Sequence, residues 1–130
     1  MPFTLFRMSP DAIKQDFESA LVKHFSFKAK LRSFLYGNSS SEGLLRDPDQ
    51  CGLGKWITSR REGIYAHIPE MKELDRQHRL IHQQANVLMD KYVAGQRDEA
   101  LAGFKGVQER ADHITQLMQT IEGKLRTAEA

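Results

Sequence analysis

The sequence predicts an all-α protein, an antiparallel four-helix-type bundle made of three long helices and one short helix. Two observations predict this fold. Apolar residues recur at three- and four-residue spacings over three long segments, and capping residues, prolines and glycines mark the ends of those segments. No segment of useful length alternates with the two-residue period of a strand. Short connections between long amphipathic helices favour antiparallel packing of neighbours.

The first long helix is expected from Ser9-Pro10-Asp11 to Tyr36. Ser9 is a suitable N-cap, Pro10 fits the first helical position, and Gly37-Asn38 is a left-handed stop signal. A loop rich in small and polar residues is expected over 38–43. One histidine lies within the apolar stripe of this helix, which consists of Ile13, Phe17, Leu21, His24, Leu31 and Leu35.

A short helix is expected to begin at Asp47-Pro48 and to end between Arg61 and Gly63. Asp47 can cap it and Pro48 can occupy its first position. Gly52 and Gly54 weaken it, since a glycine in a helix costs about 1 kcal/mol relative to alanine. We interpret these two glycines as positions where the backbone comes close to another group beside Cys51.

Two further long helices complete the bundle. The third is expected from Pro69-Glu70 to Gly95, and the fourth from near Asp98 almost to the end of the chain. Two histidines lie within the stripe of the third helix, which is Met71, Leu74, His78, Ile81, His82, Ala85, Leu88 and Tyr92. The stripe of the fourth helix is Leu101, Phe104, Val107, Ala111, Ile114, Leu117 or Met118, Ile121 and Leu125.

Length and composition exclude several classes of protein. A chain of 130 residues is enough for one domain, which we divide into an apolar N-terminal segment (1–10), the bundle (11–127) and a tail (128–130). The net charge of +2 is too small to indicate the basic surface that nucleic-acid-binding proteins carry, so no nucleic-acid partner is expected. A single cysteine excludes an intrachain disulfide. Without a membrane-length apolar segment or a signal peptide, a cytoplasmic location is expected.

The histidines on the stripes, together with the cysteine, predict a buried metal site. His78 and His82 are one helical turn apart, so their imidazoles can converge on one ion. His24 lies on the inner stripe of another helix, and Cys51 begins the short helix that closes over the bundle. Three imidazoles and one thiolate form a complete tetrahedral set for Zn²⁺.

Other chemistries fit the sequence less well. His67 and His113 lie outside the apolar stripes, so we leave them out of the site. A nucleophilic Cys51 would need an oxyanion hole and a substrate cleft, which a packed bundle does not readily provide. A di-iron site would need paired inward carboxylates, and the only near match is a single Asp75 three residues before His78.

At these residues the sequence resembles the chemoreceptor zinc-binding (CZB) domain family of bacteria, from about residue 11 to about residue 125. The resemblance rests on His24 followed by an aromatic Phe27, on the run Cys-Gly-Leu-Gly-Lys-Trp at 51–56, and on the pair His78/His82. In that family the matching three histidines and one cysteine bind one zinc ion. The aromatic residue is often Trp in the family, where this chain has Phe27.

The resemblance implies a regulatory module and no enzymatic activity. Family members are usually joined to cytoplasmic chemoreceptor signalling domains or to diguanylate cyclases, and they tend to be dimeric. We therefore expect a homodimer whose signalling partner is a chemoreceptor or a diguanylate cyclase. The chain has no room for such an output domain, so we expect a free-standing member or a piece that lacks a C-terminal output domain.

Two functions from different classes follow as hypotheses. In the first, the site is a sensor that responds to zinc availability or to oxidation of Cys51, and the short helix then detaches and carries Trp56 with it. In the second, zinc only stabilises a bundle that serves as a protein-interaction or dimerisation module. A catalytic zinc site is disfavoured, because four protein ligands leave no position for water.

Overall fold

The computed structural model describes residues 8–38 and 42–129, which form five helices. They are α1 (Pro10–Leu35), α2 (Glu42–Arg46), α3 (Gly52–Glu62), α4 (Glu70–Val93) and α5 (Arg97–Glu129). No strand occurs within the described ranges, which confirms the all-α prediction. Most of the predicted N-terminal segment lies outside the described residues.

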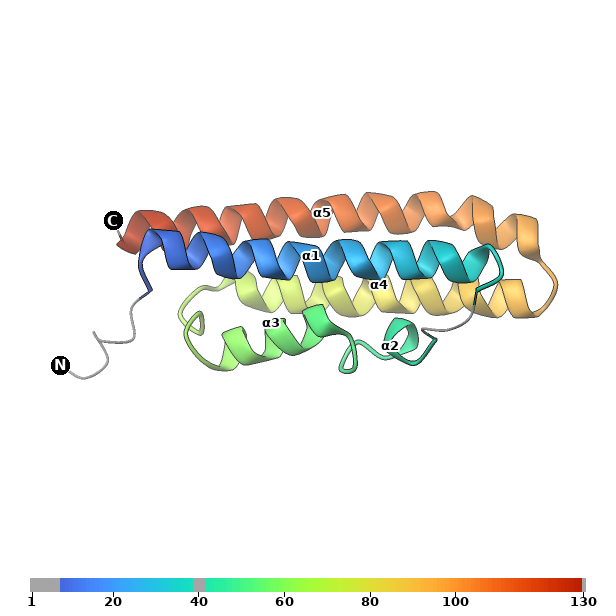
Figure 1. Cartoon of the computed structure of the whole chain (residues 1–130), viewed down its shortest axis with the longest axis horizontal. Coiled ribbons are helices and arrows are strands. Elements are labelled where there is room, and N and C mark those ends of the chain that lie inside the picture. The colour runs from blue at the N-terminus through green and yellow to red at the C-terminus, as the bar shows by residue number, and fades with distance from the viewer. Residues whose placement is uncertain (1–7, 39–41, 130) are drawn as a thin grey trace.

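Three long helices form the body of the molecule, and the two short ones cover one side of it. Figure 1 shows α1, α4 and α5 side by side, with α2 and α3 lying in line beneath them. The helices α1 and α4 run in one direction, whereas α3 and α5 run in the other. The beginning of α1 and the end of α5 lie at the same end of the bundle.

The ends of the long helices follow the predicted signals. The hydroxyl oxygen of Ser9 accepts a hydrogen bond from the backbone N–H of Ala12 at 3.1 Å, as an N-cap does. Gly37 and Gly95 follow α1 and α4 with φ of 106° and 85°, a left-handed conformation that glycine adopts without strain. These glycines therefore end the two helices where the sequence predicts.

The segment before α3 differs from the prediction in two ways. Residues 42–46, within and after the expected loop, form α2, in which Leu45 is buried and Arg46 pairs with Glu42 one turn before. In addition, α3 begins at Gly52 rather than at Pro48. The reason is that the Asp47 carboxylate accepts a hydrogen bond from the backbone N–H of Asp49 at 2.9 Å, which forms a turn instead of a cap.

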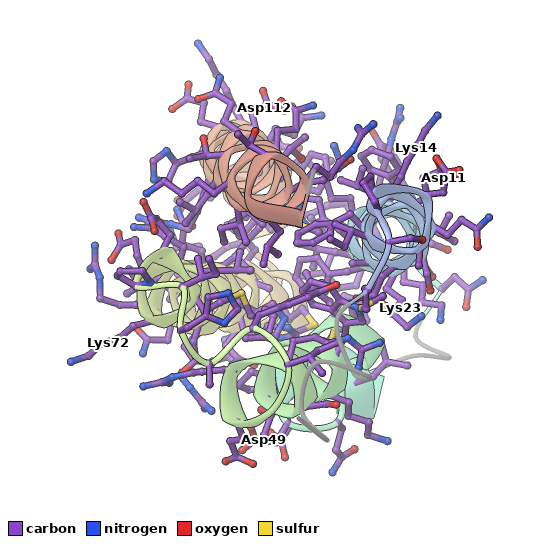
Figure 2. All side chains as sticks on the ribbon, turned by 90° about the vertical axis from the view of Figure 1, so that its left-hand side faces the viewer. Asp11, Lys14, Lys23, Asp49, Lys72 and Asp112 are labelled. Atoms are coloured by element: carbon purple, nitrogen blue, oxygen red, sulfur yellow. The ribbon has the colours of Figure 1, made fainter. Side chains whose placement is uncertain are left out.

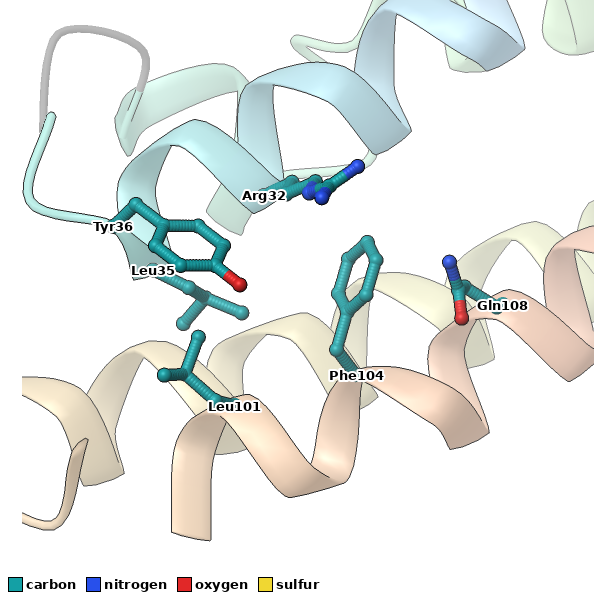
Figure 3. A pocket seen from close by; sticks show the side chains of 6 residues that line it. All are labelled: Arg32, Leu35, Tyr36, Leu101, Phe104 and Gln108. Carbon is teal, nitrogen blue, oxygen red and sulfur yellow. The ribbon is translucent and has the colours of Figure 1, made fainter. Parts of the chain in front are cut away.

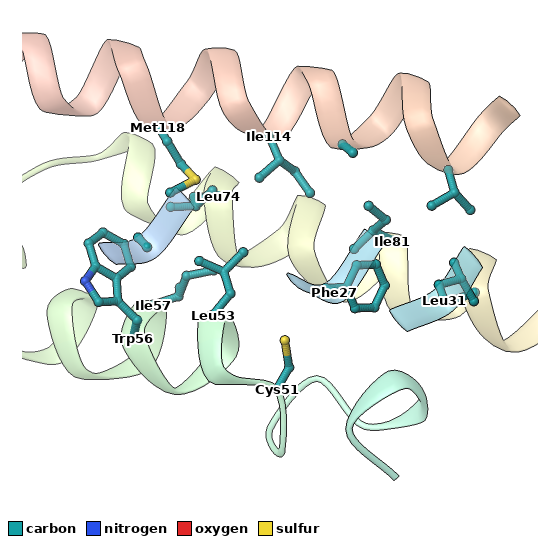
Figure 4. Close-up of a cluster of buried hydrophobic side chains, with 14 of the residues drawn as sticks. Phe27, Leu31, Cys51, Leu53, Trp56, Ile57, Leu74, Ile81, Ile114 and Met118 are labelled. Atoms are coloured by element: carbon teal, nitrogen blue, oxygen red, sulfur yellow. The ribbon is translucent and has the colours of Figure 1, made fainter. Parts of the chain in front are cut away.

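The core is the space enclosed by the helices, and charged groups surround it. In the end-on view of Figure 2 the labelled side chains of Asp11, Lys14, Asp49, Lys72 and Asp112 lie at the periphery, while buried apolar side chains fill the centre. Figure 4 shows part of this core, in which Trp56, Leu53 and Ile57 of α3 approach Leu74, Ile81, Ile114 and Met118. One apolar cluster thus connects every helix.

The second half of α3 is fixed to α1 by a polar group that we call the Asp16 anchor. It consists of Asp16, Trp56, Arg60 and Tyr65. Arg60 donates two hydrogen bonds to the Asp16 carboxylate at 2.8 and 2.6 Å. Tyr65 donates its hydroxyl hydrogen at 2.6 Å, and the indole N–H of Trp56 donates at 3.2 Å.

Electrostatics keep the Asp16 anchor in one protonation state. Burial tends to raise the pKa of Asp16, but hydrogen bonds from Arg60, Tyr65 and Trp56 outweigh it, so that the pKa lies below its usual value. The pKa of Tyr65 is raised, chiefly by burial and then by the carboxylate beside it. The carboxylate therefore stays ionised and the phenol stays neutral over the physiological range.

Candidate metal centre

Cys51, His78 and His82 come together in the interior between α3 and α4. One possible ligand atom from each residue lies within 4.8 Å of those of the other two. The three residues are only 2%, 2% and 1% exposed. Cys51 is the N-cap residue of α3, and the two histidines lie on successive turns of α4. In Figure 4 the sulfur of Cys51 points from the start of α3 into the interior.

Gly54 allows α3 to approach α4 this closely. A Cβ atom at this position would overlap the carbonyl oxygen of Pro48 and would lie 2.9 Å from Cε1 of His78. The neighbouring Gly52 is different, because a Cβ there would only make ordinary contact with the side chain of Lys23 at 3.5 Å. The expectation of a close approach therefore holds for Gly54 and not for Gly52.

Hydrogen bonding fixes which nitrogen of His82 faces the cluster. Its Nδ1–H donates to the backbone oxygen of Leu45 at 2.7 Å, so the neutral ring carries its lone pair on Nε2. That Nε2 lies 3.1 Å from Nε2 of His78. Two nitrogens bound to one tetrahedral zinc at about 2.0–2.1 Å would be about 3.3–3.4 Å apart. The two imidazoles therefore have nearly the spacing that a shared ion requires.

Burial keeps the imidazoles of the cluster neutral. The pKa of His78 is lowered to about 3, first by burial and then by repulsion from His82, His24 and Arg79. Burial also lowers the pKa of His82, against the opposing effect of its hydrogen bond to Leu45. Because metal ions bind the neutral form of imidazole, these rings are in the ligand form at neutral pH.

His24 lies in the interior on α1, outside this group of three. It is 1% exposed, and its Nε2 is 3.0 Å from the backbone oxygen of Ala111 on α5, to which it donates as Nε2–H. The other ring nitrogen, Nδ1, then carries the lone pair. Burial is the main cause of its lowered pKa. His67 and His113 are exposed.

Two backbone carbonyls that the sequence did not indicate orient the histidine rings. The carbonyls of Leu45 and Ala111 accept hydrogen bonds from His82 and His24, the role that outer partners of metal-binding histidines play. Leu45 belongs to α2, where the sequence predicted a loop up to residue 43 and no helix before Pro48. The i,i+4 spacing of Glu42 and Arg46 is the one signal that would have indicated this helix.

A cavity elsewhere in the molecule has a different chemistry. It occupies about 180 Å³ between the end of α1 and the beginning of α5. Figure 3 shows its lining, which consists of Arg32, Leu35, Tyr36, Leu101, Phe104 and Gln108. This lining contains none of the sulfur, imidazole or carboxylate groups that bind transition metals.

The fold and the cluster together define a helical metal-binding domain. Its donor set of one cysteine sulfur and two imidazole nitrogens suits Zn²⁺, which prefers nitrogen and sulfur ligands in a closed tetrahedral site.

A comparison with known families identifies the domain. The family model described as the chemoreceptor zinc-binding domain matches residues 24–89, which is 66 of the 130 residues and includes Cys51, His78 and His82. The chain therefore belongs to the chemoreceptor zinc-binding domain family, a family of zinc-binding signalling domains, and Zn²⁺ is its metal.

No curated protein and no solved structure matches the chain. Among the described residues, no helix combines the length and the apolar character that a membrane span needs.

Proposed function

We propose that this chain is a cytoplasmic sensory domain whose zinc site responds to oxidation of Cys51 or to zinc availability. The observation that supports it is the buried group of one sulfur and two imidazoles, assembled from two helices by the close approach at Gly54. A buried cysteine beside two neutral histidines combines a metal-binding function with an oxidisable atom.

His24 completes the ligand set in this proposal. It is buried, it is uncharged because of that burial, and its Nε2–H is already used by Ala111. Its Nδ1 lone pair is therefore available as a fourth donor. A charge on His24 would lower the pKa of His78, so the two rings influence one another electrostatically. A small shift of α1 toward the cluster would add this nitrogen to the set.

The sulfur of Cys51 is the reactive atom of the site. Zinc bound at the site would hold this sulfur as a thiolate, because a thiol that coordinates zinc is deprotonated. The thiolate attacks the oxygen of hypochlorous acid or hydrogen peroxide, so that an S–O bond forms as the O–Cl or O–O bond breaks. Chloride or hydroxide leaves with the electron pair, and sulfur is oxidised by two electrons to the sulfenic acid.

Oxidation of Cys51 removes a thiolate donor from the start of α3. The segment from Asp47 to Cys51 and the first turn of α3 are then no longer linked to His78 and His82 through a shared metal ion. The second half of α3 remains held by the Asp16 anchor, in which Trp56 itself takes part. We therefore propose a hinge-like movement of the first turn of α3 and of α2, a smaller change than detachment of the whole helix.

The signalling context follows from the family and not from the geometry of this chain. We propose a homodimer that acts on a chemoreceptor or on a diguanylate cyclase, with no nucleic-acid partner and no catalytic role of its own. The second candidate function is a zinc-stabilised bundle that serves only as a protein-interaction or dimerisation module. The burial of the cluster and its links to α2, α3 and α4 favour this candidate as well.

One experiment separates these candidates. Zinc content and fluorescence of Trp56, the single tryptophan, are measured before and after one equivalent of hypochlorous acid for wild type, Cys51→Ala and the surface control His113→Ala. We expect wild type and the control to lose zinc on oxidation while Trp56, held by the Asp16 anchor, changes its fluorescence only slightly, and we expect Cys51→Ala to lose no zinc. Zinc that is retained in the oxidised wild type would support the purely structural candidate. Wild type without zinc would refute both.

A further inference from the structure

A cavity of about 250 Å³ lies beside Cys51, between α1 and the segment that joins α2 to α3. Lys23, Ser26 and Lys30 of α1 line one side of it, and Cys51 and Gly52 line the other. Cys51 is only 2% exposed and its side chain caps no backbone N–H of α3, yet the residue forms part of this wall. The cavity therefore places an open space beside a buried cysteine.

Cys51 is the member of the cluster that lines this cavity. Neither His78 nor His82 lines it, and the cavity between α1 and α5 is lined by none of the three cluster residues. A small molecule in this cavity therefore lies next to Cys51 and not next to either histidine.

The charge of the cavity is positive. Lys23 and Lys30 are the charged residues of its lining, which contains no carboxylate. Lys23 lies where α1 meets the short helices, as Figure 2 shows, and its ammonium group donates a hydrogen bond to Ser19 at 2.8 Å. By contrast, the cavity beside α4 mixes arginines with Glu73 and Asp75. Lys23 is partly buried and Lys30 is exposed, and two cations at the entrance favour anionic molecules and anionic leaving groups.

The size of the cavity restricts what it admits. Sites for drug-sized molecules usually occupy about 300–1,000 Å³, so a cavity of about 250 Å³ suits a smaller molecule, of up to about ten heavy atoms. Phe27 and Leu44 make part of its wall apolar, and their side chains offer none of the hydrogen bonds that a larger polar ligand would need. The fitting class of ligand is therefore a small anion, or a small molecule that releases one.

We propose that this cavity is the port through which small, anionic thiol-reactive molecules reach Cys51, with Lys23 and Lys30 selecting for negative charge. The proposal deepens the proposed function and rests on it only in taking Cys51 as the reactive atom. In the oxidation described above, negative charge moves from the sulfur to the leaving group, and the two lysines border the space in which that charge develops.

Charged methanethiosulfonate reagents test the selection directly. The Cys51 thiolate attacks the sulfenyl sulfur of the reagent, a new S–S bond forms, and methanesulfinate leaves with the electron pair. Rates for the anionic sulfonatoethyl and the cationic trimethylammonioethyl reagents are measured on the zinc-loaded chain by intact mass. Each rate is divided by the rate of the same reagent with a small uncharged thiol, which removes the intrinsic reactivity of the reagent.

We expect wild type to favour the anionic reagent. Lys30→Glu should lower the ratio of anionic to cationic rates by about fivefold, after allowance for distance and salt screening. Lys105→Glu makes the same change of charge on the exposed surface of α5, away from the cavity, and should leave the ratio unchanged. Equal ratios in Lys30→Glu and wild type would overturn the proposal.

A second pair of variants tests the route itself. Ser26→Leu fills the cavity and should slow both reagents by about tenfold, on the assumption that a blocked route costs about 1.4 kcal/mol of activation free energy. Gly52→Ala narrows the wall without a steric clash and should slow the larger cationic reagent more than methyl methanethiosulfonate. If neither variant slows the reaction, the sulfur is reached by another path and the proposal is wrong.

Zinc content is measured on the same samples. A chain that binds no zinc but still reacts faster with the anionic reagent would refute the proposed function and would leave the proposal of the port intact.

Discussion

The two ends of α3 are attached to the rest of the molecule by different chemistry. At its beginning, Cys51 joins a group of sulfur and nitrogen donors with His78 and His82. Further along the helix, Trp56 and Arg60 bind the ionised carboxylate of Asp16 through ordinary hydrogen bonds. In the proposed function, oxidants and chelators act on the first attachment and leave the carboxylate and guanidinium of the second unchanged. The difference teaches that one short helix can respond at one end and stay fixed at the other.

The largest effect should come from breaking the attachment at the beginning of α3. We expect His78→Ala to lower zinc affinity by more than about 100-fold, because loss of an outer partner of a metal ligand already costs about 10–100-fold. Competition with a chromophoric chelator measures the affinity. Trp56 fluorescence of this variant without zinc should match that of the zinc-free wild type, since the Asp16 anchor is untouched. A large additional change would show that the two ends are not independent.

Substitution of Gly54 tests whether the metal site depends on the close approach of the α3 backbone to Pro48 and His78. Gly54→Ala should destabilise the fold by about 1–3 kcal/mol, the usual cost of overpacking, and should weaken zinc binding because His78 must move. Gly52→Ala is the matched control, since its Cβ finds room. It should stabilise the helix by about 0.5–1 kcal/mol. Denaturant unfolding of both variants gives the comparison, and equal effects would contradict the role of Gly54.

Removal of the charge of the Asp16 anchor should affect stability without affecting zinc. Asp16→Asn leaves Arg60 without its carboxylate, and hydrogen bonds to a charged group contribute about 1.5–3 kcal/mol. We expect a loss of that size in the free energy of unfolding and a shift in Trp56 emission. Zinc affinity should change by less than about threefold, because the anchor and the cluster share no residue and independent sites usually add within about 0.5 kcal/mol.

The same carboxylate predicts a pH dependence. The folded pKa of Asp16 lies below its unfolded value, so its contribution to stability is present above the unfolded value of about 3.9 and is lost as pH falls through the folded pKa. The difference in unfolding free energy between wild type and Asp16→Asn should therefore shrink as the pH falls below about 4. A difference that stays constant from neutral to acidic pH would mean that the charge of Asp16 is not what stabilises the anchor.

The smallest effect should come from one hydroxyl of the anchor. Tyr65→Phe removes a single hydrogen bond to Asp16 while keeping the ring stacked on Phe17 at 5.5 Å. We expect a loss of about 0.5–1.5 kcal/mol, the usual net value of a hydrogen bond. Thermal unfolding checks it. A loss larger than that of Asp16→Asn would mean that the phenol contributes more to the anchor than the charged carboxylate does.

Helix periodicity was enough to predict the long helices and the histidine pair. His78 and His82 share one face of α4 because residues four apart always do, so their convergence follows from spacing alone. Glycines and Ser9 marked the helix ends, where local backbone chemistry decides. The approach of Cys51 was indicated by the cost of two nearby glycines, although only Gly54 proves sterically necessary.

The remaining features depend on contacts that leave little trace in a sequence. Leu45 and Ala111 contribute backbone carbonyls, which every residue has, so no pattern of side chains marks them. The five residues of α2 are too few for a periodic signal, and their helix depends on packing of Leu45. Asp16 lies beside the apolar stripe of α1, and only the fold reveals that residues 40 to 49 positions later converge on it.

The short connection between α4 and α5 has a consequence for the order in which this protein folds. The two helices are joined by residues 94–96 alone, so they can pair after closing a very small loop. The sulfur and the imidazoles, by contrast, meet only after α3 has docked across a chain segment of more than twenty residues. Local contacts form sooner than distant ones. We therefore expect pulse-labelling hydrogen exchange to show α4 and α5 protected early, with zinc binding the last property that the newly folded chain acquires.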